Sequence, residues 1–477
     1  MGIKKVDKIC KKIEICVQNL ADFMLAKKQI TAQLSFYNTF EEQLSHSHPL
    51  YILANKINWK IFEEAFAKLY SDEGRPAKPI RLMVSLLMLK HIRNISDESV
   101  VEQWFENIYY QYFSGEKSYA CGVPCEASEL VHFRNRIGEQ GIELIFKESI
   151  RINGKDSQEQ EATTDTTVQE KNITYPTDNK LHRKIIKKCV AIAGQQDLEL
   201  RQSYTRTLKK LLMPARLRHS GGDQRFRNHP KNKGKARKAD KKIKTIAGRL
   251  VRELERKLPP NLHQNLLALF KKVLAQKRFD SDKIYSLHEP HVQCISKGKE
   301  HKKYEFGSKV SITTTLKSGV IIGALNIEKN VHDSKTLPPA LEQQQRLTGV
   351  ILKNTFVDRG YRGPKLVRGT TITLPDKPGK NRTAYEKQKL REGFKRRAAI
   401  EPKIGHLKQD HRLGRNFYSG IKGDDTNVML AAAAMNFKRI MNIYKKMFFD
   451  FFIRMVYVIQ NILLPQYFFT VNSKKAF

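Results

Sequence analysis

Helical hydrophobic periodicity runs through the first third of the chain. Apolar residues recur every three or four positions over residues 50–70, and one side of 80–92 is almost entirely apolar. Ser96 is a suitable N-cap for a third helix, which extends to about residue 112. We therefore expect residues 1–155 to form an all-helical N-terminal domain.

The second and third of these predicted helices are joined by a short link at residues 93–95. They could form a helix-turn-helix that reads DNA. They could also be an ordinary helical hairpin in a core, and the dense apolar face of residues 80–92 favours this second interpretation for that helix.

Strand patterns begin after the polar segment 156–161. The Thr-rich residues 162–168 predict one strand, and residues 305–315 and 319–327 predict a hairpin around a turn at 317–319. Two further short strands are expected at 350–357 and 370–374. Helices are expected at 333–347 and from about 383 to 444.

Between these strands the chain is helical and very basic. The clearest helix covers residues 241–258, whereas the Gly-, Asn- and Pro-containing segment 225–238 is expected to be a loop. The order of elements predicts an α/β fold with a mixed sheet and a helical insertion, at about 180–283, after the first strand.

We accordingly assign residues 156–445 to one α/β domain and residues 446–477 to an apolar C-terminal tail of unknown role. The apolar stretch 447–469 contains Asp450, Arg454 and Pro465. Because such polar groups are costly in a bilayer, a packing helix or an interaction tail is preferred to a membrane span.

The charge of the chain points to a polyanionic partner. It contains 87 Lys and Arg residues against 48 Asp and Glu, a net charge of +39 that is spread along the sequence. Nucleic acid is the natural partner, and a ribosome-associated or simply soluble basic protein is the alternative. The six scattered cysteines suggest a reducing compartment, and the Cys121–Cys125 pair, with His132 nearby, lacks a fourth zinc ligand.

Three acidic residues stand in distinctive places. Asp165 lies in the Thr-rich strand, Asp358 lies at the end of an apolar strand, and Glu401 lies beside a basic helix. Carboxylates gathered in one pocket repel each other unless cations neutralise them. Two hard cations about 4 Å apart could activate the attacking oxygen and stabilise the leaving oxygen of a phosphodiester. Sequence alone does not show that the three carboxylates meet.

The geometry around Glu401 has two solutions. On one continuous helix, Arg397, Glu401 and Lys408 would share a face. Pro402 disfavours that, so either the helix kinks or a new helix begins with Pro402 at its first position and Glu401 as N-cap.

Residues 396–408, continuing through 411–416, closely resemble the third catalytic block of bacterial insertion-sequence transposases of the family-five type. Their signature runs Tyr, two residues, Arg, three residues, Glu, six residues, Lys. The chain matches it at Arg397, Glu401 and Lys408, and has Phe394 in place of Tyr. Residues 165–178 and 356–363 look like the first and second acidic blocks, 304–309 fit the strand leading to the second, and 74–113 are similar to the family's helical domain.

The resemblance, which covers about residues 50–445, implies a ribonuclease H-like catalytic domain with a five-stranded mixed sheet. It implies that Asp165, Asp358 and Glu401 bind two Mg²⁺ or Mn²⁺ ions. Water would cleave the phosphodiester at the element's end, and the freed 3′-hydroxyl would attack target DNA. Arg397 and Lys408 would contact phosphates, and Arg359 and Arg412 are further DNA-binding candidates. Asp333 could support the metal ligands.

The implied partners are double-stranded DNA, as terminal inverted repeats and as target, and a second or further copy of the chain. Neither a nucleotide cofactor nor a membrane is expected, and the implied location is the bacterial cytoplasm, at the nucleoid. Two rivals remain: a nuclease or resolvase with the same pocket but no strand transfer, and a catalytically inactive DNA-binding relative. The sequence contains no Walker phosphate loop, no G-x-G-x-x-G after a strand and no H-E-x-x-H.

Overall fold

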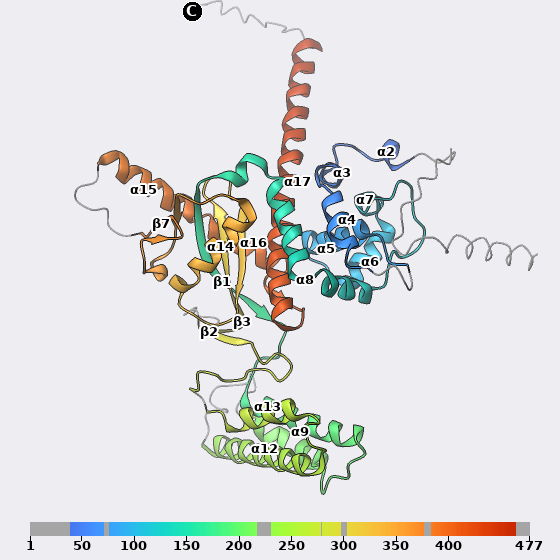
Figure 1. The fold of residues 1–477 in the computed structure, drawn as a ribbon, viewed down its shortest axis with the longest axis vertical. Helices are drawn as coiled ribbons and strands as arrows, with labels where there is room; N and C mark the ends of the chain where they lie inside the picture. Colours follow the sequence, from blue (N-terminus) through green and yellow to red (C-terminus); the bar gives the residue numbers. More distant parts are fainter. Residues whose placement is uncertain are drawn as a thin grey trace, which may run out of the picture.

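The computed structural model describes residues 39–70, 76–216, 230–277, 279–296, 303–375 and 383–463. A mixed sheet with helices around it forms the centre of these residues (Figure 1). The long helices α8 and α17 separate the sheet from a group of N-terminal helices, and a helical insertion projects from one end of the sheet (Figure 1).

Seven helices make up the described N-terminal part: α2 (Phe40–Gln43), α3 (Pro49–Lys56), α4 (Lys60–Ala67), α5 (Ile80–Arg93), α6 (Asp97–Glu106), α7 (Ile108–Phe113) and α8 (Ala127–Arg151). The single helices predicted at 50–70 and 96–112 are wrong, because each is two helices. Asn107 ends the first helix of the second pair and caps the next one by accepting a hydrogen bond from the Tyr109 amide at 2.9 Å. Ser96 is confirmed as an N-cap and accepts from the Ser99 amide at 3.1 Å.

Helix α5 is a core helix. Twelve of its residues are buried, including the charged Lys90, and it packs against α17. Of the two interpretations of residues 80–92, the one that places this helix in a hydrophobic core therefore describes it. One hydrophobic core runs through the N-terminal helices and the sheet, so the boundary expected at residue 155 does not separate two cores.

The predicted mixed sheet is confirmed. Its strands are β1 (Glu161–Lys171), β2 (Gln293–Ser296), β3 (Tyr304–Thr315), β4 (Ile321–Ile327), β5 (Asn354–Phe356), β6 (Leu366–Val367), β7 (Thr370–Thr373) and β8 (Arg415–Asn416). The central order is β4-β3-β1-β5-β7, in which β3 is antiparallel to β1 and β4, while β5 runs parallel to β1 and β7. Strands β2, β6 and β8 pair at the margins of this order.

The predicted hairpin at 305–327 is present as β3 and β4, whereas the strand expected at 350–357 is limited to β5. The helix expected at 333–347 is a short 3₁₀ turn, η2 (Asp333–Lys335), followed by α14 (Leu337–Thr348). Another 3₁₀ turn, η3 (Arg359–Tyr361), follows β5. The C-terminal helices are α15 (Ala384–Arg397), α16 (Ile400–Asp410) and α17 (Gly420–Leu463).

Helix α17 links the two halves of the molecule. It packs against α8, α5 and α3 on one side and against β4 on the other. It continues past residue 445, so the predicted tail 446–477 begins inside a helix that projects from the body (Figure 1). Residues 464–477 lie outside the described part. No described helix combines the length and the apolar character needed to cross a bilayer.

The insertion between β1 and β2 contains α9 (Asp178–Gln195), α10 (Thr205–Arg216), α12 (Pro230–Lys257) and α13 (Gln264–Ala275). It has a hydrophobic core of its own, in which Ile185, Ile243 and Phe270 are fully buried. The loop expected at 225–238 is wrong from residue 230 onward, because α12 begins at Pro230 and buries Ala236 and Ala239; residues 225–229 lie outside the described part. Lys and Ala are good helix formers, and in this first part of α12 they outweigh Gly234.

The two ends of the insertion lie next to each other. Lys171, at the end of β1, places its ammonium 3.5 Å from the carboxylate of Glu289, which precedes β2. The same ammonium binds Asp424 of α17 at 2.7 Å, and all three side chains are at least nine-tenths buried. The insertion is therefore anchored to the sheet by a buried ion-pair cluster.

Candidate active site

The parallel register of β1 and β5 brings Asp165 and Asp358 together. Thr163 is the Cα partner of Phe356 in this ladder. Two residues further along each chain are Asp165 and Asp358. Because residues two apart in extended chain point to the same side, the side chains of Asp165, within β1, and Asp358, just after β5, project next to each other.

Arg397 confirms this proximity through its contacts. Its Nη2 lies 4.0 Å from Oδ2 of Asp165 and 3.8 Å from Oδ2 of Asp358. Its side chain is only 15% exposed, and its Nε is buried without a hydrogen-bond partner among the described atoms. One guanidinium thus lies near both carboxylates and partly neutralises them.

Close packing of α15 on β5 places that guanidinium. The ring of Phe356 lies against the backbone of Gly393 and forms an edge-to-face pair with Phe394, with 5.4 Å between the ring centroids. Arg397 follows Gly393 by four residues, about 6 Å along a helix. Asp358 follows Phe356 by two residues, about 6.6 Å along extended chain. The distance from Gly393 to Arg397 along the helix is therefore similar to the distance from Phe356 to Asp358 along the extended chain. Arg397 accordingly lies beside Asp358.

The two carboxylates have similar local partners and different exposure. Oδ1 of Asp165 accepts the Thr166 amide at 2.7 Å, and Oδ1 of Asp358 accepts the Arg359 amide at 2.6 Å. Asp165 is 20% exposed, whereas Asp358 is 56% exposed. Asp358 therefore faces solvent, and the pair is open to a ligand from that side.

Asp333 belongs to the surroundings of this pair. Its Oδ1 accepts the Thr166 hydroxyl at 3.0 Å and lies 3.0 Å from the ammonium of Lys309. Burial raises the pKa of Tyr361 well above its usual value, and the nearby Asp165 and Asp333 carboxylates add to the rise. Tyr361 therefore remains a neutral phenol beside Asp165. The sequence drew attention to Asp333 and missed Lys309, Thr166 and Tyr361 as its neighbours.

Glu401 is not brought to the aspartate pair. The described residues contain no group of three His, Cys, Asp or Glu side chains close enough to hold a metal ion. Helix α15 ends at Arg397, residues 398–399 form a turn, and α16 begins at Ile400, so Arg397 and Glu401 do not share one continuous helix. Glu401 is exposed and lies in the first turn of α16.

The new helix predicted at Pro402 therefore begins two residues earlier, and Glu401 is not its N-cap. Pro402 is tolerated because the amides of the first helical turn have no intrahelical acceptor. Ile400 and Leu407 are fully buried and fix α16 in the core. Glu401 and Lys408 are seven residues apart and so lie on the same flank of α16.

The two remaining predicted DNA-binding residues, Arg359 and Arg412, lie in different parts of the structure. Arg359 is exposed, next to Asp358 in η3. Arg412 donates to the Ile95 carbonyl at 2.8 Å and lies over the ring of Phe417 at 5.4 Å, so it connects the chain after α16 to the N-terminal helices. Its structural contacts were not visible in the sequence.

Comparisons with known proteins agree on one family. Residues 38–136 match a family model described as a transposase domain (DUF772), and residues 279–437 match one described as a transposase DDE domain. The second match contains Asp358, Arg397 and Glu401, whereas Asp165 precedes it.

A relative described as the uncharacterized protein ORF8 in the nfe locus of Rhizobium meliloti is 42% identical over 169 residues, which cover 34% of this chain and 82% of that protein. No solved structure matches the chain. Together with the family matches, this likeness shows that the chain belongs to the DDE transposases of insertion sequences.

Proposed function

We propose that the protein binds the terminal repeats of its own insertion sequence, cleaves their ends by metal-assisted phosphodiester hydrolysis and joins the 3′-hydroxyls to target DNA. The observation that carries the proposal is the convergence on Arg397 of Asp165, in the middle of β1, and Asp358, just after the end of the parallel strand β5. The strand order β4-β3-β1-β5-β7 supports a ribonuclease H-like domain, with the helical insertion after its first strand.

The aspartate pair fits a hard divalent cation. Each carboxylate uses Oδ1 for a backbone amide and directs Oδ2 toward the shared guanidinium. Mg²⁺ prefers oxygen ligands and usually takes one or two carboxylates from a protein. Asp165 and Asp358 would hold it, and Glu401 is proposed as the third ligand. Bound Mg²⁺ or Mn²⁺, proposed as two ions, supplies activation of the attacking oxygen and stabilisation of the leaving oxygen.

The other residues bind and orient the DNA. Arg397 supplies positive charge beside the carboxylates, which favours a DNA phosphate next to them. Arg359 is exposed at the same edge, and Lys408 lies on the flank of α16 that carries Glu401. We also propose that Arg412 contacts the DNA. Two or more copies of the chain are proposed to assemble on it.

The test uses a duplex with the DNA ends that flank the gene, with and without Mg²⁺. The parent protein is compared with Asp358→Asn and Glu401→Gln, and DNA binding is measured separately. We expect metal-dependent 3′-hydroxyl ends from the parent only, with binding retained by both variants. Cleavage that survives in both variants would show that the carboxylates are assigned wrongly.

A target plasmid in the same reaction separates the rival activities. Joined products support transposition. Cleaved ends that never join would indicate a nuclease. Tight binding without cleavage by the parent protein would indicate an inactive DNA-binding relative.

A further inference from the structure

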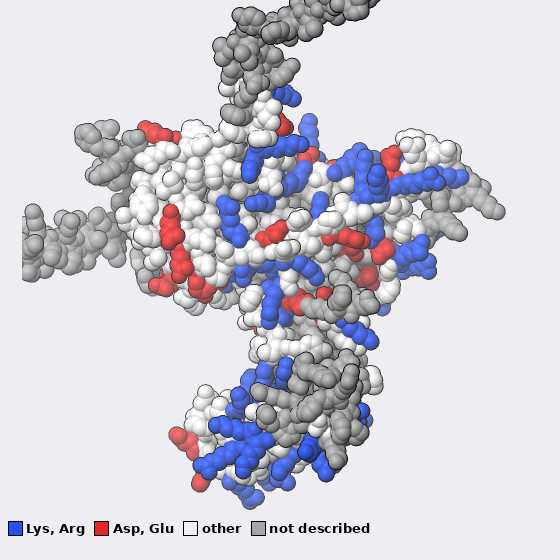
Figure 2. Space-filling model, turned by 180° about the vertical axis from the view of Figure 1, so that it is seen from behind, with Lys and Arg blue, Asp and Glu red and all other residues white. Residues whose placement is uncertain are grey.

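Helix α12 of the insertion carries an excess of positive charge that its own fold does not neutralise. The helix contains twelve Lys or Arg residues and three acidic ones. The acidic residues are engaged within the insertion. Asp240 accepts a hydrogen bond from Asn179, Glu253 pairs with Lys257, and Glu255 pairs with Lys271. Figure 2 shows Lys and Arg gathered over the insertion, at the lower end of the molecule.

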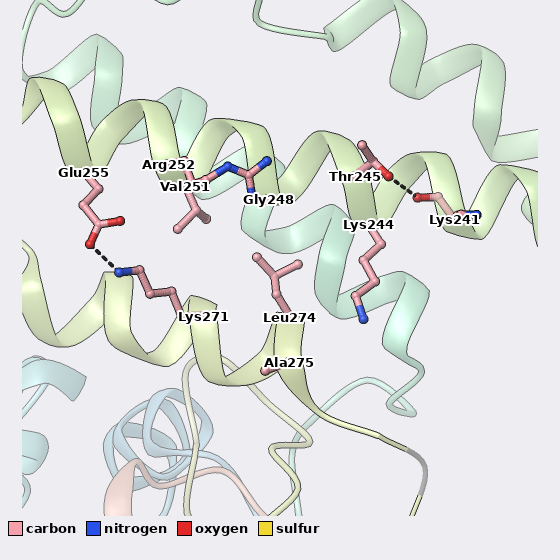
Figure 3. Close-up of a pocket in the computed structure, with 10 residues that line it drawn as sticks. All are labelled: Lys241, Lys244, Thr245, Gly248, Val251, Arg252, Glu255, Lys271, Leu274 and Ala275. Atoms are coloured by element: carbon pink, nitrogen blue, oxygen red, sulfur yellow. Dashed lines mark hydrogen bonds and ion pairs between the residues drawn. The ribbon is translucent and has the colours of Figure 1, made fainter.

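Part of this charge lines an open groove of about 720 Å³ between α12 and α13. Lys241, Lys244 and Arg252 follow one stripe of α12, and Lys271 of α13 pairs with Glu255 at one end of the groove (Figure 3). No carboxylate of the described residues lies within 4.0 Å of the first three cations. Thr245 and Gly248 lie between them, and a Cβ at Gly248 would be 3.4 Å from the guanidinium of Arg252. The groove therefore offers three cations and one hydroxyl along α12, with the Glu255–Lys271 ion pair at one end.

The spacing of this line suits a polymer of phosphates. Lys241 and Arg252 are eleven residues apart, about 16 Å along the helix. Successive phosphates of one DNA strand follow every ~3.4 Å of duplex axis, so several of them pass within reach of such a row. Lys, Arg and Thr are also the side chains that typically contact phosphate oxygens. The lining contains no Asn or Gln, the amides that read adenine, which favours contact with the backbone over contact with the bases.

We propose that the α12–α13 groove binds the phosphate backbone of duplex DNA without reading its sequence, as a contact separate from the Asp165–Asp358 pair. The insertion has its own hydrophobic core, so this contact is built on a unit distinct from the one that carries the carboxylates. The inference rests on the proposed function for the identity of the polyanion. It adds to that function a surface that holds DNA away from the reacting phosphodiester.

The test compares two triple variants of the full chain with equal loss of charge. The groove variant is Lys241→Gln, Lys244→Gln and Arg252→Gln. The control is Lys242→Gln, Arg249→Gln and Arg256→Gln, which changes one other flank of the same helix. All six side chains are exposed, so neither variant disturbs the core. Binding to a labelled duplex of arbitrary sequence is measured by fluorescence anisotropy across a range of salt concentrations.

Each phosphate contact contributes about 0.9 to the slope of log affinity against log salt concentration. We expect the groove variant to lose about 2 to 3 units of slope and the control to lose less than about 1. The single variant Lys244→Gln should lose about 1 unit. Equal losses in both triple variants would show that only net charge matters, and an unchanged slope in the groove variant would also overturn the proposal. Poly-glutamate that competes as well as DNA for the same groove would assign it to acidic protein instead.

A separate readout distinguishes this proposal from the proposed function. At saturating DNA with the transposon ends and Mg²⁺, the groove variant should cleave at the parent's rate, because the carboxylates are unchanged. If the parent does not cleave, the proposed function fails. The salt dependence of DNA binding still tests whether the groove binds DNA. A groove variant that binds normally but does not cleave would contradict its role as a binding surface.

Discussion

Phe356 and Gly393 are packed so closely that a Cβ on Gly393 would lie 2.4 Å from the ring of Phe356. This contact fixes the height of α15 on β5, and Arg397 stands one helical turn further along the same helix. A residue without a side chain thus determines where the guanidinium meets Asp358.

Replacing Gly393 with Ala should destabilise the protein by about 1 to 3 kcal/mol, because the added methyl group forces the ring or the helix to move. The measurement is urea unfolding followed by circular dichroism. Gly405→Ala in α16 is the matched control, since a Cβ there meets nothing within 4 Å. The control should be neutral or stabilising by up to about 1 kcal/mol. Equal effects of the two substitutions would contradict the packing argument.

Arg397→Gln should lower the thermal stability of the metal-free protein and increase the stabilisation that Mg²⁺ provides. The variant removes the cation shared by Asp165 and Asp358, so their repulsion is no longer offset. We expect a loss of about 1 kcal/mol or less without metal, because the pair is partly exposed. Thermal unfolding with and without Mg²⁺ measures both effects. Arg396→Gln, an exposed neighbour on α15, is the control. An identical Mg²⁺ shift in the parent and in Arg397→Gln would count against a metal site at the aspartates.

Lys403 should make stability depend on alkaline pH. Burial lowers the pKa of its ammonium to about 8, with a further contribution from Arg439, and its Nζ donates to the Gly319 carbonyl. Between pH 8 and the ordinary lysine pKa near 10.5, the unfolded chain binds more protons than the folded one, so the stability contribution rises with pH.

The measurement is the free energy of unfolding of the parent and of Lys403→Met from pH 7.5 to 10. The difference, parent minus variant, should increase with pH by at most about 1.4 kcal/mol per pH unit. The exposed Lys353→Met provides a control for the general effect of losing a lysine. A difference that stays constant over this range would show that Lys403 keeps an ordinary pKa.

Removing the ammonium at the base of the insertion should be costly. Lys171→Met removes the ammonium shared by Glu289 and Asp424 and leaves His291, 3.5 Å and 3.1 Å from them, as their other basic neighbour. Loss of one partner from a buried cluster typically costs about 3 to 5 kcal/mol. Lys187→Met, on the exposed side of α9, should change the urea midpoint little. If both variants unfold at the same urea concentration, the buried cluster does not stabilise the attachment.

The sequence predicted the mixed sheet and the family well, because both depend on local patterns. Alternation in 305–327 marked the hairpin, and the blocks around Asp358 and Glu401 carried the family resemblance. The helix breaks at Asn107 and at residues 57–59 were missed because the apolar periodicity continues across them. Their positions depend on capping and packing, which a periodicity does not record.

The site was predictable in its residue types and less so in its geometry. Asp165 and Asp358 meet because of a strand register between segments almost 200 residues apart, and no local signal specifies that register. The position of Glu401 depends on the turn at 398–399, which the sequence left open between two alternatives. The roles of Glu401, Lys408, Arg359 and Arg412 remain predictions.

The contact between Lys171 and Glu289 also bears on how such a chain can change over generations. Since the insertion leaves and re-enters the sheet at almost the same point and folds on its own core, its length adds little to the entropy of pairing β1 with β3. A longer, shorter or differently folded module could occupy that position without altering the register that aligns Asp165 with Asp358. The insertion can therefore change in length or in fold without disturbing the aspartate pair, because its two ends stay joined at the base of the sheet.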